Sequence, residues 1–96
     1  MPEPSPPVTL AGFQKHIRDR YHENDKARGT PATFMWLIEE VGELATALHG
    51  DDRENLAEEF ADCIAWLSTL ANINDIDLEA AIRRKYLENG GPTGIK

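Results

Sequence analysis

Hydrophobic residues along the chain recur at intervals of three and four residues, which is the spacing of an amphipathic helix. Four such segments are separated by polar, glycine-containing or proline-containing stretches, and no segment alternates as a strand would. The sequence therefore predicts an all-α fold, a bundle of four helices.

The first helix is expected from Thr9 to about Tyr21, with a polar connector over 24–29. Its hydrophobic stripe consists of Leu10, Phe13, Ile17 and Tyr21. This helix could also close a ligand pocket against the other helices. The sequence leaves open which of its residues would do so; the candidates are Phe13, Gln14, Ile17 and Arg20.

The second helix is expected to begin where Thr30 offers an N-capping hydroxyl before Pro31. It should end at His49, because Gly50 is a typical C-terminal cap. Its apolar residues are Phe34, Leu37, Ile38, Val41, Leu44, Ala45 and Leu48.

The third helix should follow almost without a loop, since Asp51 and Glu54 resemble a capping box. It should reach about Ala71 and form an antiparallel hairpin with the second helix. A fourth helix, capped by Asp77, should end at Gly90.

The length of 96 residues fits one domain, expected over 9–96. Residues 1–8 contain four prolines and are expected to form a flexible arm. So small a domain buries only somewhat more than about 60% of its unfolded surface. We therefore expect a homodimer or homotetramer.

Composition narrows the function. Seventeen acidic residues against ten basic ones give a net charge of −7, which argues against nucleic-acid polymers and anionic membranes as partners. The single Cys63 cannot form an intramolecular disulfide, and no apolar run approaches the length of a membrane span. A soluble, cytoplasmic protein is expected.

Two pairs of acidic residues lie at matching heights on the predicted hairpin. At about 1.5 Å per residue, Glu43 and Glu40 lie about 9 and 14 Å from the turn. On the other helix, Glu59 and Asp62 lie about 12 and 17 Å from it. The four carboxylates should therefore converge, Glu43 opposite Glu59 and Glu40 opposite Asp62.

Converging carboxylates repel one another unless they are protonated or bind a cation. Because the ligands are hard oxygens, this pattern predicts a site for Mg²⁺ or Mn²⁺. The alternative is a solvated helix face, and this is the interpretation that fits Glu39, Glu54 and Glu58.

The segment Glu39-Glu40-Val41-Gly42-Glu43, followed by Glu59-Phe60-Ala61-Asp62, resembles the EExxE…ExxD signature of MazG-like nucleoside triphosphate pyrophosphohydrolases. Lys85 and Asn89, expected one turn apart on the fourth helix, match the KxxxN element of that family. The resemblance extends from about Leu10 to Pro92.

The resemblance implies Mg²⁺-dependent cleavage of a nucleoside triphosphate to the monophosphate and pyrophosphate, in a dimer or a dimer of dimers that cleans the nucleotide pool. The implied metal ligands are Glu40, Glu43, Glu59 and Asp62. Glu39, Glu40 and Lys85 are the implied catalytic residues, with Glu39 behind the metal ligands or orienting the water.

Lys85 would offer a positive charge to the phosphates, and Asn89 would bind a phosphate oxygen or a sugar hydroxyl. The structural alternatives are an exposed lysine and a C-terminal cap beside Gly90.

Trp36 precedes Glu40 by one turn, and Trp66 follows Asp62 by one turn, so the two rings should lie level on the metal face. A nucleobase could stack between or beside them. Core packing is the competing interpretation.

Two other functions compete with the pyrophosphohydrolase. One is phosphoribosyl-ATP pyrophosphatase of histidine biosynthesis, which has a similar acidic motif. The other is a non-catalytic helical dimerisation module, which would not need Lys85 and Asn89 in register. A di-iron bundle is disfavoured, because the sequence has no Glu-x-x-His pair.

Overall fold

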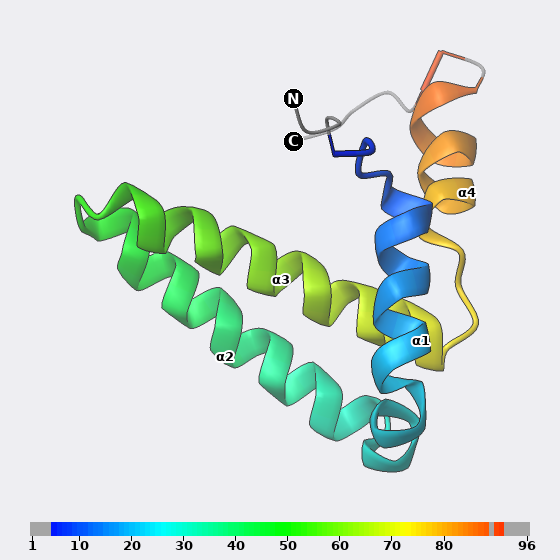
Figure 1. Cartoon of the computed structure of the whole chain (residues 1–96), viewed down its shortest axis with the longest axis horizontal. Helices are drawn as coiled ribbons and strands as arrows, with labels where there is room; N and C mark the ends of the chain where they lie inside the picture. The colour runs from blue at the N-terminus through cyan, green and yellow to red at the C-terminus, as the bar shows by residue number, and fades with distance from the viewer. Residues whose placement is uncertain (1–4, 89, 92–96) are drawn as a thin grey trace.

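The computed structural model describes residues 5–88 and 90–91. These residues form four α-helices and one π-helical segment, with no strand among them (Figure 1). The all-α prediction is therefore confirmed. The elements are α1 (Leu10–Arg28), α2 (Thr30–His49), α3 (Arg53–Ile73), α4 (Leu78–Ile82) and the π-helix η1 (Arg83–Leu87).

The helices α2 and α3 lie side by side and antiparallel, as predicted, and their interface is the most extensive one between elements of the described structure. We call them the hairpin. The α1 helix packs across the open end of the hairpin, mainly on α3, and α4 lies beside the N-terminal half of α1 (Figure 1). The turn of the hairpin projects away from α1 and α4.

The predicted connector at 24–29 is wrong, because α1 continues to Arg28 and Gly29 is the sole residue between α1 and α2. This part of the helix has no apolar stripe, but it is held by tertiary contacts. Asp25 is buried and accepts a hydrogen bond from Thr69 of α3. Gly29 has φ 85°, a left-handed conformation that glycine adopts without a side-chain clash, and it turns the chain.

The start of α2 differs by one residue from the prediction. Gly29 occupies the N-cap position, and the Thr30 hydroxyl instead accepts a hydrogen bond of 3.2 Å from Asn74 Nδ2. The long-range partner therefore competes successfully with the local cap. The predicted end of α2 at His49, before Gly50, is confirmed.

The boundaries of α3 are also shifted. Asp52, not Asp51, is the N-cap, and its Oδ1 accepts a 3.0 Å hydrogen bond from the Asn55 backbone N–H. The helix continues past Ala71 to Ile73, because Asn72 is buried and bonded to Gln14 of α1.

The predicted cap of α4 is confirmed, since Asp77 Oδ1 accepts a hydrogen bond from the Ala80 N–H. The expected single α-helix up to Gly90 is wrong. After Ile82 the chain widens into η1, which ends at Leu87. Single π-turns inside helices often occur at functional sites.

Each hairpin helix carries a buried seam. On α2 the seam runs through Thr33, Leu37, Glu40, Leu44 and Ala47, and on α3 it runs through Leu56, Glu59, Cys63, Trp66 and Leu70. All ten positions are buried or half-buried. Two of them are glutamates, so the acidic residues interrupt an otherwise largely apolar seam.

A second stripe lies one residue after the seam positions on both helices. In antiparallel helices these positions share one face of the hairpin. Its large hydrophobic side chains are 44 to 59% exposed, and we call them the apolar face: Phe34, Ile38, Val41, Leu48, Phe60, Ile64 and Leu67. Positions three residues after the seam, such as Thr69, lie on the opposite face, where α1 packs.

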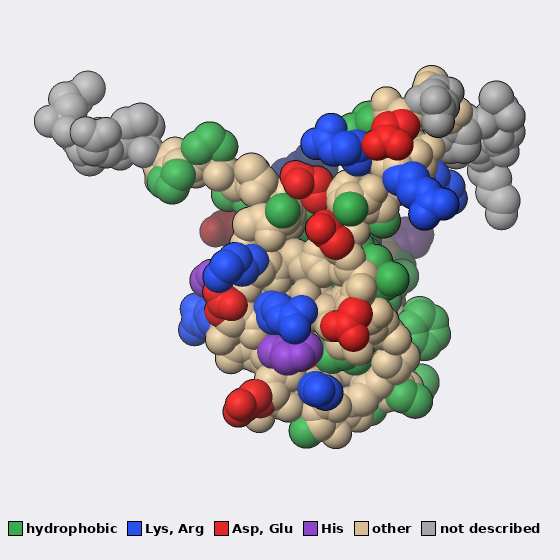
Figure 2. All heavy atoms as spheres, turned by 90° about the vertical axis from the view of Figure 1, so that its right-hand side faces the viewer, with side chains coloured by type: hydrophobic (Ala, Val, Ile, Leu, Met, Phe, Trp, Pro, Cys, Tyr) green, Lys and Arg blue, Asp and Glu red, His purple; other side chains and the backbone are tan. Residues whose placement is uncertain are grey.

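The surface over the α1 and α4 end of the molecule is mixed in charge. Figure 2 shows Lys and Arg side chains interspersed with Asp and Glu there, with hydrophobic side chains gathered at one edge. None of the helices in the described residues has an apolar stretch long enough to cross a membrane.

Candidate active site

Three carboxylates meet between the hairpin helices. One oxygen each of Glu40, Glu43 and Glu59 lies within 4.8 Å of the other two. We call these residues the carboxylate cluster. Glu40 and Glu59 lie on the seam, and Glu43, three residues after Glu40, is exposed on the face that α1 partly covers.

The cluster lacks a compensating positive charge among the described residues. The Oε2 atoms of Glu40 and Glu59 are buried and have no hydrogen-bond partner. Desolvation, and then repulsion from Glu43 and Asp62, raises the pKa of both glutamates. Buried, unpartnered carboxylates are unfavourable by themselves, so this arrangement fits a bound cation.

The donor set also indicates which cation fits. The three clustered side chains offer carboxylate oxygens, the type of ligand that Mg²⁺ and Mn²⁺ prefer. Cys63 lies nearby on the seam, but burial and the neighbouring carboxylates raise the pKa of its thiol. A cysteine sulfur is also a softer ligand than the oxygens that Mg²⁺ and Mn²⁺ prefer.

The remaining acidic candidates lie at the margin of the cluster. Asp62 is exposed; it repels Glu40 and Glu59, but it is not within the group of three. Glu39 is exposed and lies outside the group. Their roles as ligand and as water-orienting base stay predictions.

The rings of the two tryptophans lie next to each other and nearly parallel. The ring centroids of Trp36 and Trp66 are 6.2 Å apart, with an interplanar angle of 18°. Stacking of a base between the two rings stays a prediction, because it would need a separation of about 6.8 Å, close to the one observed. Trp36 is 46% exposed and offers a surface beside the pair, so stacking beside it stays a prediction.

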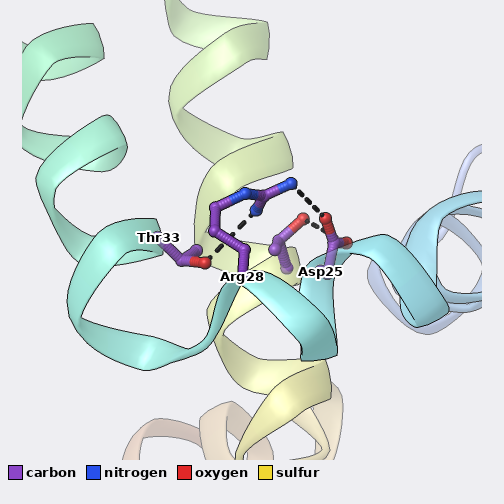
Figure 3. Close-up of polar contacts among 4 residues, drawn as sticks. Asp25, Arg28 and Thr33 are labelled. Atoms are coloured by element: carbon purple, nitrogen blue, oxygen red, sulfur yellow. Dashed lines mark hydrogen bonds and ion pairs between the residues drawn. The ribbon is translucent and has the colours of Figure 1, made fainter.

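A second polar group, which sequence reasoning missed, lies where α1 meets the hairpin. Asp25 accepts hydrogen bonds from Arg28 Nη2 at 2.9 Å and from Thr69 Oγ1 at 3.2 Å. Arg28 Nη1 donates to Thr33 Oγ1 at 3.2 Å (Figure 3). The guanidinium carbon lies 5.1 Å from the Trp66 ring centroid. We call Asp25, Arg28, Thr33 and Thr69 the Asp25 network.

A pocket of about 280 Å³ opens beside this network, between α1 and α3. It is lined by Ile17, Tyr21, Asp25, Arg28, Ala65, Trp66 and Thr69. Of the four α1 residues considered for closing a pocket, Ile17 lines this one. Gln14 instead donates hydrogen bonds to Asn72 and to the Ile76 carbonyl, and so joins α1 to α3 and the following loop.

The structure does not bring Lys85 to the carboxylate cluster within one chain. Its Nζ lies 5.5 Å from the Tyr86 ring centroid, and η1 packs mainly against α4. In Figure 1, the helix α4 lies at the opposite end of the molecule from the hairpin turn. Asn89 lies outside the described residues, so its predicted pairing with Lys85 stays a prediction.

Comparison with known proteins identifies the family. A model of the MazG nucleotide pyrophosphohydrolase domain matches residues 29–87, which span α2 to η1 and include the carboxylate cluster. A search of curated proteins found no match. The matched segment covers more than half of the chain and begins just after α1. The chain therefore belongs to the family of MazG nucleotide pyrophosphohydrolase domains.

Proposed function

We propose that the protein hydrolyses a ribo- or deoxyribonucleoside triphosphate to the monophosphate and pyrophosphate, with Mg²⁺ or Mn²⁺ as cofactor. The observation that carries the proposal is the pair of buried, unpartnered oxygens of Glu40 and Glu59 beside Glu43. Family membership supports the same activity. Removal of damaged or excess nucleotides in the cytoplasm would be its role.

The metal would be held by Glu40, Glu43, Glu59 and Asp62. When bound, it supplies positive charge toward the phosphates and lowers the pKa of a coordinated water. A triphosphate would otherwise be repelled by the carboxylates. This requirement explains why a strongly acidic site suits an anionic substrate.

The packing of the hairpin supports this assignment of metal ligands. Glu40 lies between the seam residues Leu37 and Leu44, so helix packing sets its position. The side chains of Glu43 and Asp62 are exposed, so a substrate can reach them. Glu39 is proposed to orient the attacking water, and Trp36 and Trp66 to provide the surface on which the base stacks.

Lys85 and Asn89 are proposed as phosphate ligands. Because η1 packs mainly against α4, this role requires that η1 moves toward the cluster or that Lys85 comes from a second copy. By either route, the Lys85 ammonium group would reach the phosphates of the substrate.

A second copy of the chain is proposed to cover the apolar face, giving a homodimer or a dimer of dimers. Seven large hydrophobic side chains on one surface are unusual for a monomer. Light scattering should give at least twice 10.7 kDa at micromolar concentration. Ile38→Lys should shift the protein toward monomer, whereas Thr46→Lys, an exposed change on the same helix, should not.

The decisive experiment measures pyrophosphate and orthophosphate release from a panel of standard and damaged nucleotides, including phosphoribosyl-ATP, with Mg²⁺ or Mn²⁺. Glu40→Gln and Glu59→Gln should each lower the rate by about a hundredfold or more, since even the partners of metal ligands contribute 10- to 100-fold. Glu54→Gln, an exposed change on α3, is the matched control.

Pyrophosphate release in the wild type and its loss in the two cluster variants would support the proposal. If no nucleotide is cleaved, the helical interaction module becomes the better interpretation. If phosphoribosyl-ATP alone is cleaved, the better interpretation is the phosphoribosyl-ATP pyrophosphatase of histidine biosynthesis.

A further inference from the structure

The pocket between α1 and α3 lies one substrate length from the carboxylate cluster. Glu59 and Trp66 both lie on the seam of α3, seven residues or about 10 Å apart. Trp66 forms part of the pocket wall. A nucleotide whose triphosphate is held at the cluster can therefore extend along α3 and place its base in the pocket.

The walls of the pocket suit a flat, apolar ligand. Ile17 and Ala65 provide aliphatic surface, and Tyr21 and Trp66 provide rings. Its volume of about 280 Å³ is at the lower end for small-molecule sites, which fits a base better than a whole nucleotide.

The polar end of the pocket presents hydrogen-bond donors. Both Asp25 oxygens already accept hydrogen bonds, from Arg28 and Thr69. Arg28 has five N–H groups and uses two of them in the contacts seen among the described residues. Its side chain lines the pocket and is 27% exposed. A ligand there meets a guanidinium that has donors to spare and is held in place by Asp25.

An edge of donors discriminates among bases. Guanine presents the adjacent acceptors O6 and N7, which an arginine can bind with two hydrogen bonds. The pyrimidines also carry keto oxygens. Adenine sets an amino donor beside its N7 acceptor, so one of the two contacts would become a clash between donors.

We infer that this pocket receives the base of the substrate and that Arg28 selects bases with a keto oxygen over adenine. The inference rests on the proposed function and names its substrate class. Tyr21, Asp25 and Arg28 belong to α1, outside the segment matched by the family model. The selectivity is thus assigned to a part of this chain beyond the matched domain.

The first test compares kcat/KM for ATP, GTP, CTP and UTP in the wild type and in Arg28→Lys. Lysine keeps a charge beside Asp25 but lacks the planar fork. The wild type should prefer at least one keto-base nucleotide to ATP by about tenfold or more, and Arg28→Lys should reduce that ratio to near one. An unchanged ratio, or a wild type that prefers ATP, would overturn the inference.

The second test fills the pocket and reads binding without turnover. Ala65→Leu places a larger side chain in the pocket, and Ala61→Leu makes the same change one turn earlier at an exposed position outside it. Non-hydrolysable GTP should quench tryptophan fluorescence, and Ala65→Leu should weaken its affinity about tenfold relative to Ala61→Leu. Equal affinities would remove the base from this pocket.

The two tests separate the inference from the proposed function. Cleavage of nucleotides with no effect of Arg28→Lys or Ala65→Leu rejects the pocket and keeps the pyrophosphohydrolase. If nucleotide binding depends on both residues but no nucleotide is cleaved, the pocket is kept and the pyrophosphohydrolase is rejected. If both variants weaken every nucleotide equally and the ratio to ATP persists, Arg28 binds a phosphate and the selectivity is overturned.

Discussion

Two groups of polar side chains, one between the hairpin helices and one where α1 meets the hairpin, differ in one respect. In the Asp25 network, a carboxylate faces an arginine and two hydroxyl groups close the remaining hydrogen bonds. In the carboxylate cluster, like charges face one another and two oxygens have no partner. The buried charge of the first group is balanced within the chain, whereas the second group needs a positive charge from outside. Burial of a polar group does not by itself indicate a metal site, but buried carboxylates without a counter-charge do.

The largest expected effect on stability separates the two groups directly. Asp25→Ala leaves Arg28 without its counter-charge and Thr69 without its acceptor, so it should lower the free energy of unfolding by about 3 kcal/mol. Urea unfolding measures this change. Asp19→Ala, which removes an exposed ion pair with Lys15, should change it by about 0.5 kcal/mol or less. Equal effects of the two substitutions would contradict the contrast.

Metal binding at the carboxylate cluster should stabilise the folded protein. A cation that binds only the folded state at 100 times its Kd raises the free energy of unfolding by about 2.7 kcal/mol. Thermal unfolding with and without Mg²⁺ should show a higher Tm in the wild type and in Asp19→Ala. The double variant Glu40→Gln/Glu59→Gln should show no such rise, and an equal rise in that variant would place the metal elsewhere.

Without metal, repulsion among the carboxylates of the cluster should destabilise the fold. Removing one of these charges should therefore stabilise it. Glu59→Gln removes one of the repelling charges and should therefore raise the free energy of unfolding in EDTA. Glu58→Gln, an exposed neighbour, serves as the control. A loss of stability in Glu59→Gln would mean that the carboxylate is satisfied by contacts within the protein.

The smallest effect is the dependence of stability on pH. The pKa values of Glu40 and Glu59 are raised above 4.5 in the folded state, so this state binds more protons than the unfolded chain above that pH. In EDTA, the free energy of unfolding should therefore fall as pH rises from 4.5 through the raised pKa values. The double variant should show a flatter profile, and identical profiles would argue against the raised pKa values.

Local signals in the sequence predicted much of this arrangement. Helical periodicity identified the hairpin, Asp77 identified the start of α4, and the rise per residue placed Glu43 next to Glu59. These features depend on residues near in sequence or on the regular geometry of two helices joined by a tight turn.

Long-range contacts account for what the sequence missed. The bond from Thr69 to Asp25 joins residues 44 positions apart, and it keeps a polar segment helical that looks like a connector. Likewise, Asn74 takes the Thr30 hydroxyl that would otherwise cap α2. Neither partner can be identified before the packing of α1 on α3 is known. The π-turn at Lys85 has no such explanation in the contacts of the described residues.

The one-residue corner at Gly29 makes substrate range a property of the backbone. Because nothing else separates α1 from α2, the angle at Gly29 sets how far Tyr21 and Arg28 lie from Trp66. A side chain at Gly29 has space, since its nearest neighbour would be Pro31 Cδ at 4.0 Å, but φ 85° disfavours it. Gly29→Ala should therefore alter the ratio of nucleotides cleaved without touching a residue that contacts them. A new substrate range could arise at this corner while the carboxylate cluster stays as it is.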